Sequence, residues 1–382
     1  MPEQPLLRRA VAVVLEHSLL LVGGALAGLV WANLALPQYE QFAGALRFIV
    51  NDVGMTFFFA IATKEVFEAT LPGGPLASWR QAAVPLISAA GGMLVPALIF
   101  VALAHHFGET TLARGWAIPC ATDIAFSYMI ARFIFSSRHP AIPFLLLLAI
   151  ADDALGLFIL ALFYPTGEVR LGEFAIGIVV ALVVAGVLRR AGVRSFWPYI
   201  LVAGGIAWIA LERGGLHPAL ALVPIVPFLP HARRGHEPDI QEQPTHDALN
   251  EFEHWWKTPV EVILFFFGLV NAGVPIASVG PGTWFVLAGL IVGKPIGIFL
   301  STELSALAHL HWPSGLTWRD MLVVGAVAGV GFTVALFFTT AAFPPGLELD
   351  QTKMGALLSF GAVFPATALA MLLGVGRFGR AS

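Results

Sequence analysis

Long apolar stretches separated by short polar or turn-rich segments repeat along the whole chain. Twelve of them approach or reach the about 17–25 residues that a helix needs to cross a bilayer. The stretches lie at residues 13–34, 47–67, 81–104, 115–135, 142–163, 172–190, 196–212, 216–230, 259–277, 283–304, 320–343 and 354–375, the seventh and eighth being the shortest. The pattern predicts an all-α polytopic membrane protein of about twelve transmembrane helices, with residues 1–382 forming a single integral membrane domain.

A long polar stretch, residues 231–257, lies between the eighth and ninth apolar stretches. It predicts a surface loop. Cytoplasmic loops of membrane proteins carry an excess of lysine and arginine. If the amino terminus is cytoplasmic, fifteen of the 21 Lys and Arg residues fall on the cytoplasmic side and five outside, with Lys294 inside the membrane. The charge distribution therefore predicts that both termini and the polar loop are cytoplasmic.

Two of the apolar stretches are interrupted. The fourth contains Pro119 followed by Asp123, and the eleventh contains three glycines within seven residues, at positions 325, 329 and 331. Interrupted helices at corresponding places in two halves of a chain are typical of transporter binding sites. The fourth stretch lies between the third and fifth, and the eleventh between the tenth and twelfth. The sequence therefore predicts two three-helix repeats of opposite orientation, each with a broken middle helix.

Composition narrows the function further. The chain is 58% hydrophobic and 12% charged, whereas soluble domains carry about 25% charged residues. A net charge of −3 excludes a basic nucleic-acid-binding face, and the single Cys120 excludes an intrachain disulfide. The sequence contains no metal-ligand spacing, phosphate-binding loop or dinucleotide fingerprint. We therefore expect that the protein binds no cofactor and is not an enzyme.

Asp152 and Asp153 stand side by side in the middle of the fifth apolar stretch. A carboxylate at the centre of a membrane helix costs about 2.5–3.5 kcal/mol on insertion scales, so an acid pair there indicates an ion or proton site. Lys294 is the twelfth residue of the 22-residue tenth stretch, too deep to reach the interface, and needs a buried carboxylate partner. Adjacent helical residues point about 100° apart. One aspartate can therefore face Lys294 while the other faces a cavity.

Oxygen ligands near these acids suit a small hard cation such as Na⁺ or Li⁺. Thr122 and Asp123 lie in the interrupted fourth stretch, where Pro119 frees backbone carbonyl groups. Two close carboxylates also share protons, so protons and cations would compete for the same oxygens, as an exchanger requires. The alternative interpretations are structural: a helix cap for Asp123, a backbone hydrogen bond for Thr122 and a buried ion pair for Lys294.

Five short motifs carry a wider resemblance. They are Gly115-Trp116-Ala117-Ile118-Pro119-Cys120-Ala121-Thr122-Asp123-Ile124-Ala125-Phe126, Leu148-Ala149-Ile150-Ala151-Asp152-Asp153, Asn271-Ala272-Gly273-Val274, Gly293-Lys294-Pro295-Ile296-Gly297-Ile298 and Gly329-Val330-Gly331-Phe332-Thr333. In order, and within a match over about residues 50–340, they closely resemble the bacterial NhaA sodium/proton antiporters. The resemblance implies a multi-pass antiporter of the bacterial inner membrane that exchanges Na⁺ or Li⁺ for protons by alternating access, serving sodium extrusion and pH homeostasis.

The resemblance also assigns roles to individual residues. It implies that Asp153 is the principal cation ligand and that Asp152 is the carboxylate paired with Lys294. Asp123 and Thr122 correspond to the residues at the crossing of the two broken helices, where they offset the helix dipoles. The implied metal is thus the transported Na⁺, held by Asp153 and Asp152, and the implied partners are Na⁺ or Li⁺, protons and membrane lipid, with no nucleic acid.

Several titratable residues are candidates for pH sensing. His217 matches a family histidine near the membrane edge, and histidine changes charge near physiological pH. Glu65 and the cluster of Glu251, Glu253 and His254 lie on the predicted cytoplasmic side, where the family places such groups. A packed histidine and an ordinary solvated charge cluster are the structural alternatives.

The sequence also departs from the family. The usual Gly-Leu-Glu-Val-Lys-Arg-Glu run reads Thr63-Lys64-Glu65-Val66-Phe67-Glu68-Ala69, which keeps the first glutamate and loses the basic residues after it. The segment Pro37–Arg47 is too short for the hairpin through which some members dimerise. A homodimer, if it forms, would need another contact. A related cation or proton-coupled transporter and a non-transporting sensor therefore stay open as alternatives.

An intramembrane aspartyl hydrolase is the rival of a different class, because it also needs two buried aspartates. Such enzymes bring the acids from two helices to flank one peptide bond. Adjacent Asp152 and Asp153 cannot do so, and Lys294 has no role in that chemistry. The sequence thus favours the exchanger.

Overall fold

The computed structural model describes residues 19–136, 138–231, 247–307, 310 and 315–379, and these residues form helices and connecting segments without a β-strand. The helices of the first half are α2 (Leu19–Leu34), α3 (Leu36–Arg47), α4 (Met55–Thr70), α5 (Trp79–His106), α6 (Ile124–Ile134), α7 (Ala141–Phe163), α8 (Leu171–Arg190) and α9 (Gly205–Arg213). Those of the second half are α10 (Ala248–Asn271), α11 (Pro281–Ala288), α12 (Lys294–Leu307), α13 (Trp318–Ala328), α14 (Phe332–Ala342), α15 (Leu347–Leu358) and α16 (Val363–Leu373).

Six of the described helical segments are long and apolar enough to cross a membrane. They are Leu36–Thr70, Ala82–His106, Ala141–Phe163, Leu171–Arg190, Pro281–Leu307 and Leu347–Phe378. Several join two α-helices through a short irregular turn, such as the π-helices η1 (Phe48–Gly54) and η8 (Gly289–Gly293). The chain is a multi-pass helical membrane protein, as the apolar pattern predicts.

Two bent pairs of helices pass the same test together, so the described residues contain up to eight spans if each pair counts as one. Thr110–Cys120 meets Ile124–Ile134 at 58°, and Trp318–Ala328 meets the next helix, Phe332–Ala342, at 53°. These are the fourth and eleventh stretches, so the prediction of two broken spans is confirmed. The breaks touch, because the backbone N–H of Asp123 donates to the carbonyl of Val330 at 2.8 Å.

The eighth apolar stretch is not a helix, and that prediction is wrong. Residues 216–230 form turns and two short 3₁₀ segments, η5 (Pro218–Leu220) and η6 (Val226–Phe228). Prolines at positions 218, 224 and 227 explain the difference. Each lacks a backbone N–H and clashes with the preceding turn, so a continuous α-helix cannot form over this stretch.

The predicted polar loop is shorter than expected. Helix α10 begins at Ala248, so residues 248–257 are helical, while residues 232–246 lie outside the described residues. The side chain of Asp247 caps the helix by accepting the backbone N–H of Asn250 at 2.8 Å. Leu249 and Phe252 are buried on one face, which gives this polar segment a packed side. The helix cap and the buried apolar stripe therefore favour a helix over residues 248–257, although the segment is charged.

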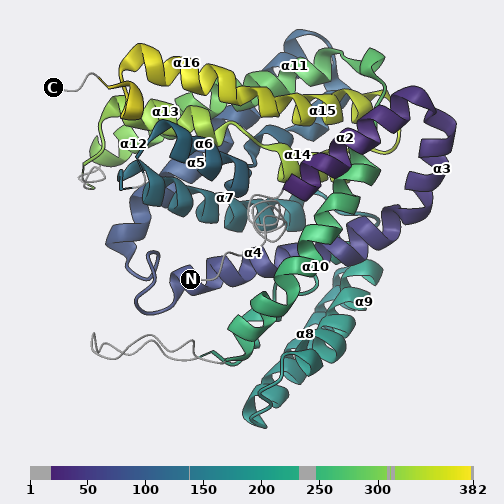
Figure 1. Cartoon of the computed structure of the whole chain (residues 1–382). Coiled ribbons are helices and arrows are strands. Elements are labelled where there is room, and N and C mark those ends of the chain that lie inside the picture. The colour runs from purple at the N-terminus through teal and green to yellow at the C-terminus, as the bar shows by residue number, and fades with distance from the viewer. Residues whose placement is uncertain (1–18, 137, 232–246, 308–309, 311–314, 380–382) are drawn as a thin grey trace, which may run out of the picture.

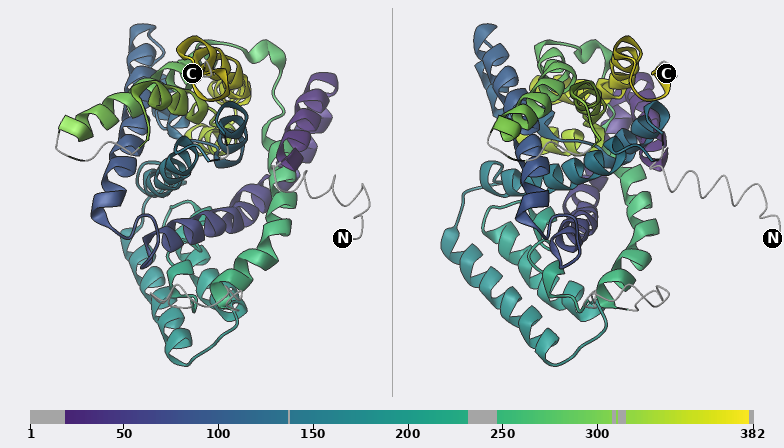
Figure 2. Two further views of the ribbon diagram at one scale, coloured as in Figure 1. Left: turned by 60° about the vertical axis from the view of Figure 1, so that its left-hand side comes forward. Right: turned by 90° about the vertical axis from the view of Figure 1, so that its left-hand side faces the viewer.

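The helices form two groups (Figures 1 and 2). Helices α5, α6, α7 and α11 to α16 form one bundle, in which α12 packs on α5 and α13, and α11 packs on α15. In the other group α2 runs along α10, and α8 runs along α9. Helix α4 packs on both α7 and α10, so it lies where the two groups meet.

Candidate functional site

Asp152 and Lys294 form a buried ion pair. Lys294 is fully buried on α12, and its Nζ lies 3.1 Å from Oδ2 of Asp152 on α7. The same carboxylate oxygen accepts the hydroxyl of Thr122 at 2.5 Å, and Lys294 Nζ donates to the carbonyl of Cys120 at 2.6 Å. Three separate segments thus meet at one charge pair, and both charges have further hydrogen bonds, as buried ions require.

Asp123 lies between the amino-terminal ends of two half-helices. Its carboxylate accepts the backbone N–H of Phe126 at 3.3 Å, which caps α6. It also accepts the backbone N–H of Thr333, at 3.1 Å, and the Thr333 hydroxyl, at the start of α14. Helix amino termini carry partial positive charge, so this carboxylate is stabilised by both half-helices.

Lys294 lies at the opposite kind of helix end. Cys120 is the last residue of the first half of the bent span, and its carbonyl is among the groups that such an end leaves unpaired. A positive charge there complements the partial negative charge of the carbonyl end. At the crossing of the two broken spans, Asp123 therefore lies at the amino-terminal ends of two half-helices, and Lys294 lies at the carboxyl-terminal end of another.

Asp153 has different surroundings from Asp152. Its side chain lines a cavity of about 250 Å³ together with one face of α4, one face of α10 and the two breaks. Within the described part of the chain it forms no hydrogen bond and no ion pair. In the structure Asp152 thus faces Lys294, while Asp153 faces a cavity.

Asp152 retains one free oxygen. Its Oδ1 is buried and has no hydrogen-bond partner, whereas most buried polar atoms have one. A second, smaller cavity of about 20 Å³ touches both Asp152 and Asp153. That volume is large enough for one water molecule. Because two aspartates line this space, a small cation there would have carboxylate oxygens available as ligands.

The wall of the larger cavity carries further charges. Glu65 of α4 and Glu253, Lys257 and Glu261 of α10 all line it. Glu253 forms an ion pair with Lys64, which also pairs with Glu68 at 2.7 Å. The structure thus brings Glu65 and Glu253 of the predicted pH-sensing cluster to the cavity.

Glu251 and His254 are exposed on α10 and do not line the cavity. Lys257 and Glu261 do line it, although they were absent from the sequence-based set. The available signal was their spacing: Lys257 follows Glu253 by four residues and Glu261 follows Lys257 by four, and residues four apart share a helix face.

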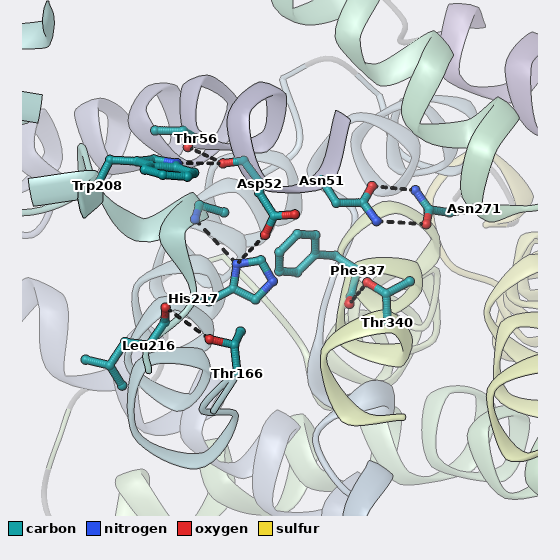
Figure 3. Close-up of polar contacts among 11 residues, drawn as sticks. Asn51, Asp52, Thr56, Thr166, Trp208, Leu216, His217, Asn271, Phe337 and Thr340 are labelled. Atoms are coloured by element: carbon teal, nitrogen blue, oxygen red, sulfur yellow. Dashed lines mark hydrogen bonds and ion pairs between the residues drawn. The ribbon is translucent and has the colours of Figure 1, made fainter. Parts of the chain in front are cut away.

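His217 is not among the residues that line the two cavities beside Asp152 and Asp153; Figure 3 shows its surroundings. It is buried, its Nδ1 lies 4.0 Å from Oδ1 of Asp52, and its ring centroid lies 4.9 Å from that of Phe337 on α14. The backbone carbonyl of Asp52 accepts hydrogen bonds from the hydroxyl of Thr56, at 2.8 Å, and from the indole N–H of Trp208, at 3.2 Å. Asp52 and His217 therefore form a separate polar group beside the π-helical turn η1.

Asn51 and Asn271 join η1 to the end of α10 (Figure 3). Their side-chain amides exchange two hydrogen bonds, at 3.1 and 2.7 Å, and Asn271 also donates to the carbonyl of Phe267 at 3.0 Å. Both side chains are buried. This pair gives Asn271, the first residue of the Asn-Ala-Gly motif, a structural role at the end of an apolar helix.

Known proteins with similar sequences point to one family. Residues 9–373 match the family model described as Na⁺/H⁺ antiporter 1. The chain is 45% identical to the Na(+)/H(+) antiporter NhaA of Jannaschia sp. over 393 residues, covering 91% of this chain and 93% of the relative. It is 44% identical to the NhaA of Desulfitobacterium hafniense over 378 residues, covering 96% of this chain and 97% of that one.

A solved structure shares the fold. The sodium proton antiporter MjNhaP1 from Methanocaldococcus jannaschii, solved at pH 8, matches with a TM-score of 0.54. It is 15% identical in sequence, and the match covers 93% of this chain and 91% of that one. At this identity the likeness concerns the arrangement of helices alone.

Proposed function

This chain belongs to the NhaA family of Na⁺/H⁺ antiporters, and we propose that it exchanges Na⁺ or Li⁺ for protons across the bacterial inner membrane. The observation that supports this most strongly is the contrast between Asp152 and Asp153. Asp152 is neutralised by Lys294 at 3.1 Å, whereas Asp153 has no cationic partner within the described residues and lines a cavity. The chain is a transporter, so the hydrolase alternative is set aside.

Asp153 is the proposed principal ligand because an unpaired carboxylate in a low-dielectric site is costly. Either a proton or a bound cation neutralises it, and these are the two transported species. Asp152 is the second proposed ligand, since its Oδ1 has no hydrogen-bond partner and the residue lines the small cavity that both aspartates touch. Thr122 orients Asp152, and Asp123 holds the two half-helices together at the crossing.

The position of the cavity, between two groups of helices, supports a mechanism of alternating access. One wall belongs to α4 and α10, and the other belongs to the two breaks and α7. Movement of the bundle that carries the breaks against α4 and α10 would close this cavity and open the site on the other side. We propose that about twelve spans in two inverted repeats support this movement, as in discontinuous-helix transporters.

We also propose that both termini, the segment 231–247 and the cavity mouth face the cytoplasm. The support is the lysine and arginine bias, fifteen on that side against five. Glu253 and Lys257, which lie near the charged start of α10, line this cavity.

Purified protein in sealed vesicles tests the exchange directly. We expect Na⁺ or Li⁺ added outside to drive proton movement that a pH-sensitive dye reports inside, with choline chloride as the inactive control. A protein that is folded in the vesicles and moves no protons under a sodium gradient would instead support the non-transporting sensor.

A further inference from the structure

One wall of the cavity carries a stripe of three charges on α10. Glu253, Lys257 and Glu261 are spaced four residues apart and all line the cavity. Residues at this spacing are neighbours on one helix face. Lys257 therefore stands between two glutamates in the space through which an ion reaches Asp153.

The other charges around the cavity are almost all negative. Helix α4 contributes Glu65, which lies within electrostatic range of Lys257, Lys64, Glu68 and Glu253. Lys64 is not among the lining residues, and its ammonium group pairs with Glu68 and with Glu253, which does line the cavity.

Deeper in, the charged lining groups are Asp153 of α7 and Asp123 of the first break, with Asp152 behind them paired to Lys294. Helix α14 adds the uncharged Thr333 and Val334. Among the described lining residues, Lys257 is thus the one basic side chain, and it is exposed.

We propose that Lys257 is a tethered counter-cation that sets the apparent affinity of the site for Na⁺. The ammonium group occupies the same negative potential that attracts an incoming ion, so it competes with Na⁺ electrostatically without leaving the protein. This inference rests on the proposed exchange function, because it concerns the path to Asp153.

The physics gives the effect a distinctive pH dependence. Removal of one charge across a wet cavity changes the local affinity for a monovalent cation by about three- to tenfold. A proton carries the same charge as Na⁺, so both bind more tightly when Lys257 is neutralised. At acidic pH protons occupy the site, so the tighter binding of the proton offsets the tighter binding of Na⁺. The half-saturating Na⁺ concentration should therefore fall at alkaline pH and should not fall at acidic pH.

The experiment measures exchange against Na⁺ concentration in vesicles, with the same pH on both sides. We would compare the wild type with Lys257→Gln and with Lys257→Arg, which keeps the charge. Glu261→Gln removes a negative charge from the same wall. Arg194→Gln is the matched control, because Arg194 is exposed near the start of α10 and does not line the cavity.

At alkaline pH we expect Lys257→Gln to lower the half-saturating Na⁺ concentration about three- to tenfold and Glu261→Gln to raise it, with the maximal rate little changed. Lys257→Arg and Arg194→Gln should match the wild type. Added choline chloride should shrink these differences, because salt screens charges in a wet cavity. A purely structural role for Lys257 would change the maximal rate and would not respond to salt.

An unchanged half-saturating concentration in Lys257→Gln at alkaline pH would overturn the inference while leaving the exchange function intact. Equal shifts for Lys257→Gln and Arg194→Gln would also overturn it, since overall surface charge would then be the cause. A wild-type protein without exchange would count against the proposed function itself.

Discussion

At the scale of single residues, two neighbours in the sequence have different surroundings. Asp152 and Asp153 are adjacent on α7, yet Asp152 contacts Lys294 and Thr122 while Asp153 lines a cavity. The difference follows from the helix, which turns each side chain about 100° from the last. Substitutions at the two positions should therefore have different effects.

Asp153→Asn should give a folded protein that moves neither Na⁺ nor protons. Asparagine keeps the size of the side chain and removes the charge that a cation or a proton must neutralise. Exchange in vesicles should fall to the level of empty vesicles, while thermal stability stays near that of the wild type. Glu251→Gln is the control, because it removes an exposed carboxylate outside the cavity. Near-normal exchange by Asp153→Asn would contradict the assignment of the site.

Lys294→Ala should lower stability strongly, because it leaves Asp152 charged, buried and held by Thr122 alone. Removing one partner of a buried ion pair costs about 3–5 kcal/mol, whereas replacing both partners can be nearly neutral. Adding Asp152→Asn should therefore restore part of the loss. Thermal unfolding of the four proteins in one detergent measures the coupling. Additive losses would show that the two charges do not stabilise one another.

At the scale of helices, part of the arrangement can be read from the sequence. Pro119 and the glycines of the eleventh stretch interrupt apolar runs, so both breaks are visible without a structure. Local patterns also place the acids and Lys294 at membrane depth. They do not tell which segments meet: Lys64 and Glu253 are 189 residues apart, and Asn51 and Asn271 are 220 apart.

The errors have local causes. Apolar composition alone predicted a helix over residues 216–230, where prolines break the backbone hydrogen bonding. Charge alone predicted a loop over residues 248–257, where a capping aspartate and a buried stripe favour a helix. Lys257 and Glu261 were missed because a cavity wall is defined by its distant partners as well as by its own helix.

Gly331→Ala tests the crossing of the two broken helices. A Cβ at this position would lie 2.9 Å from the carbonyl oxygen of Ala121, a backbone atom of the other break. The breaks would have to separate, and overpacking of this kind costs about 1–3 kcal/mol. We expect lower thermal stability and slower exchange.

Gly23→Ala is the matched control, because a Cβ there meets no atom within 4 Å. Alanine in that helix should leave both stability and exchange near the wild-type values. If Gly331→Ala behaves like this control, the close approach of the two breaks is not needed for transport.

At the scale of the whole molecule, one bundle carries the acids and the breaks, while α4 and α10 form the facing wall of the cavity. The ion pair between Lys64 and Glu253 and the amide pair between Asn51 and Asn271 both join α4 or its π-helical turn to α10. These contacts lie within the facing wall. They would keep the wall intact during the movement of the bundle that we propose for alternating access.

A single site that serves both ions in turn predicts competition between them. In the proposed mechanism Asp153 holds a proton or takes part in binding Na⁺, so the apparent Na⁺ affinity should weaken as pH falls, by about tenfold per unit for each proton that must leave first. The maximal rate at saturating Na⁺ should change much less, because excess cation displaces the protons. Exchange measured against Na⁺ concentration at several pH values, equal on both sides, separates the two quantities. A fixed affinity with a collapsing maximal rate would instead indicate a pH switch away from the site, for which Glu65, Glu253 and His217 are the residues to substitute next.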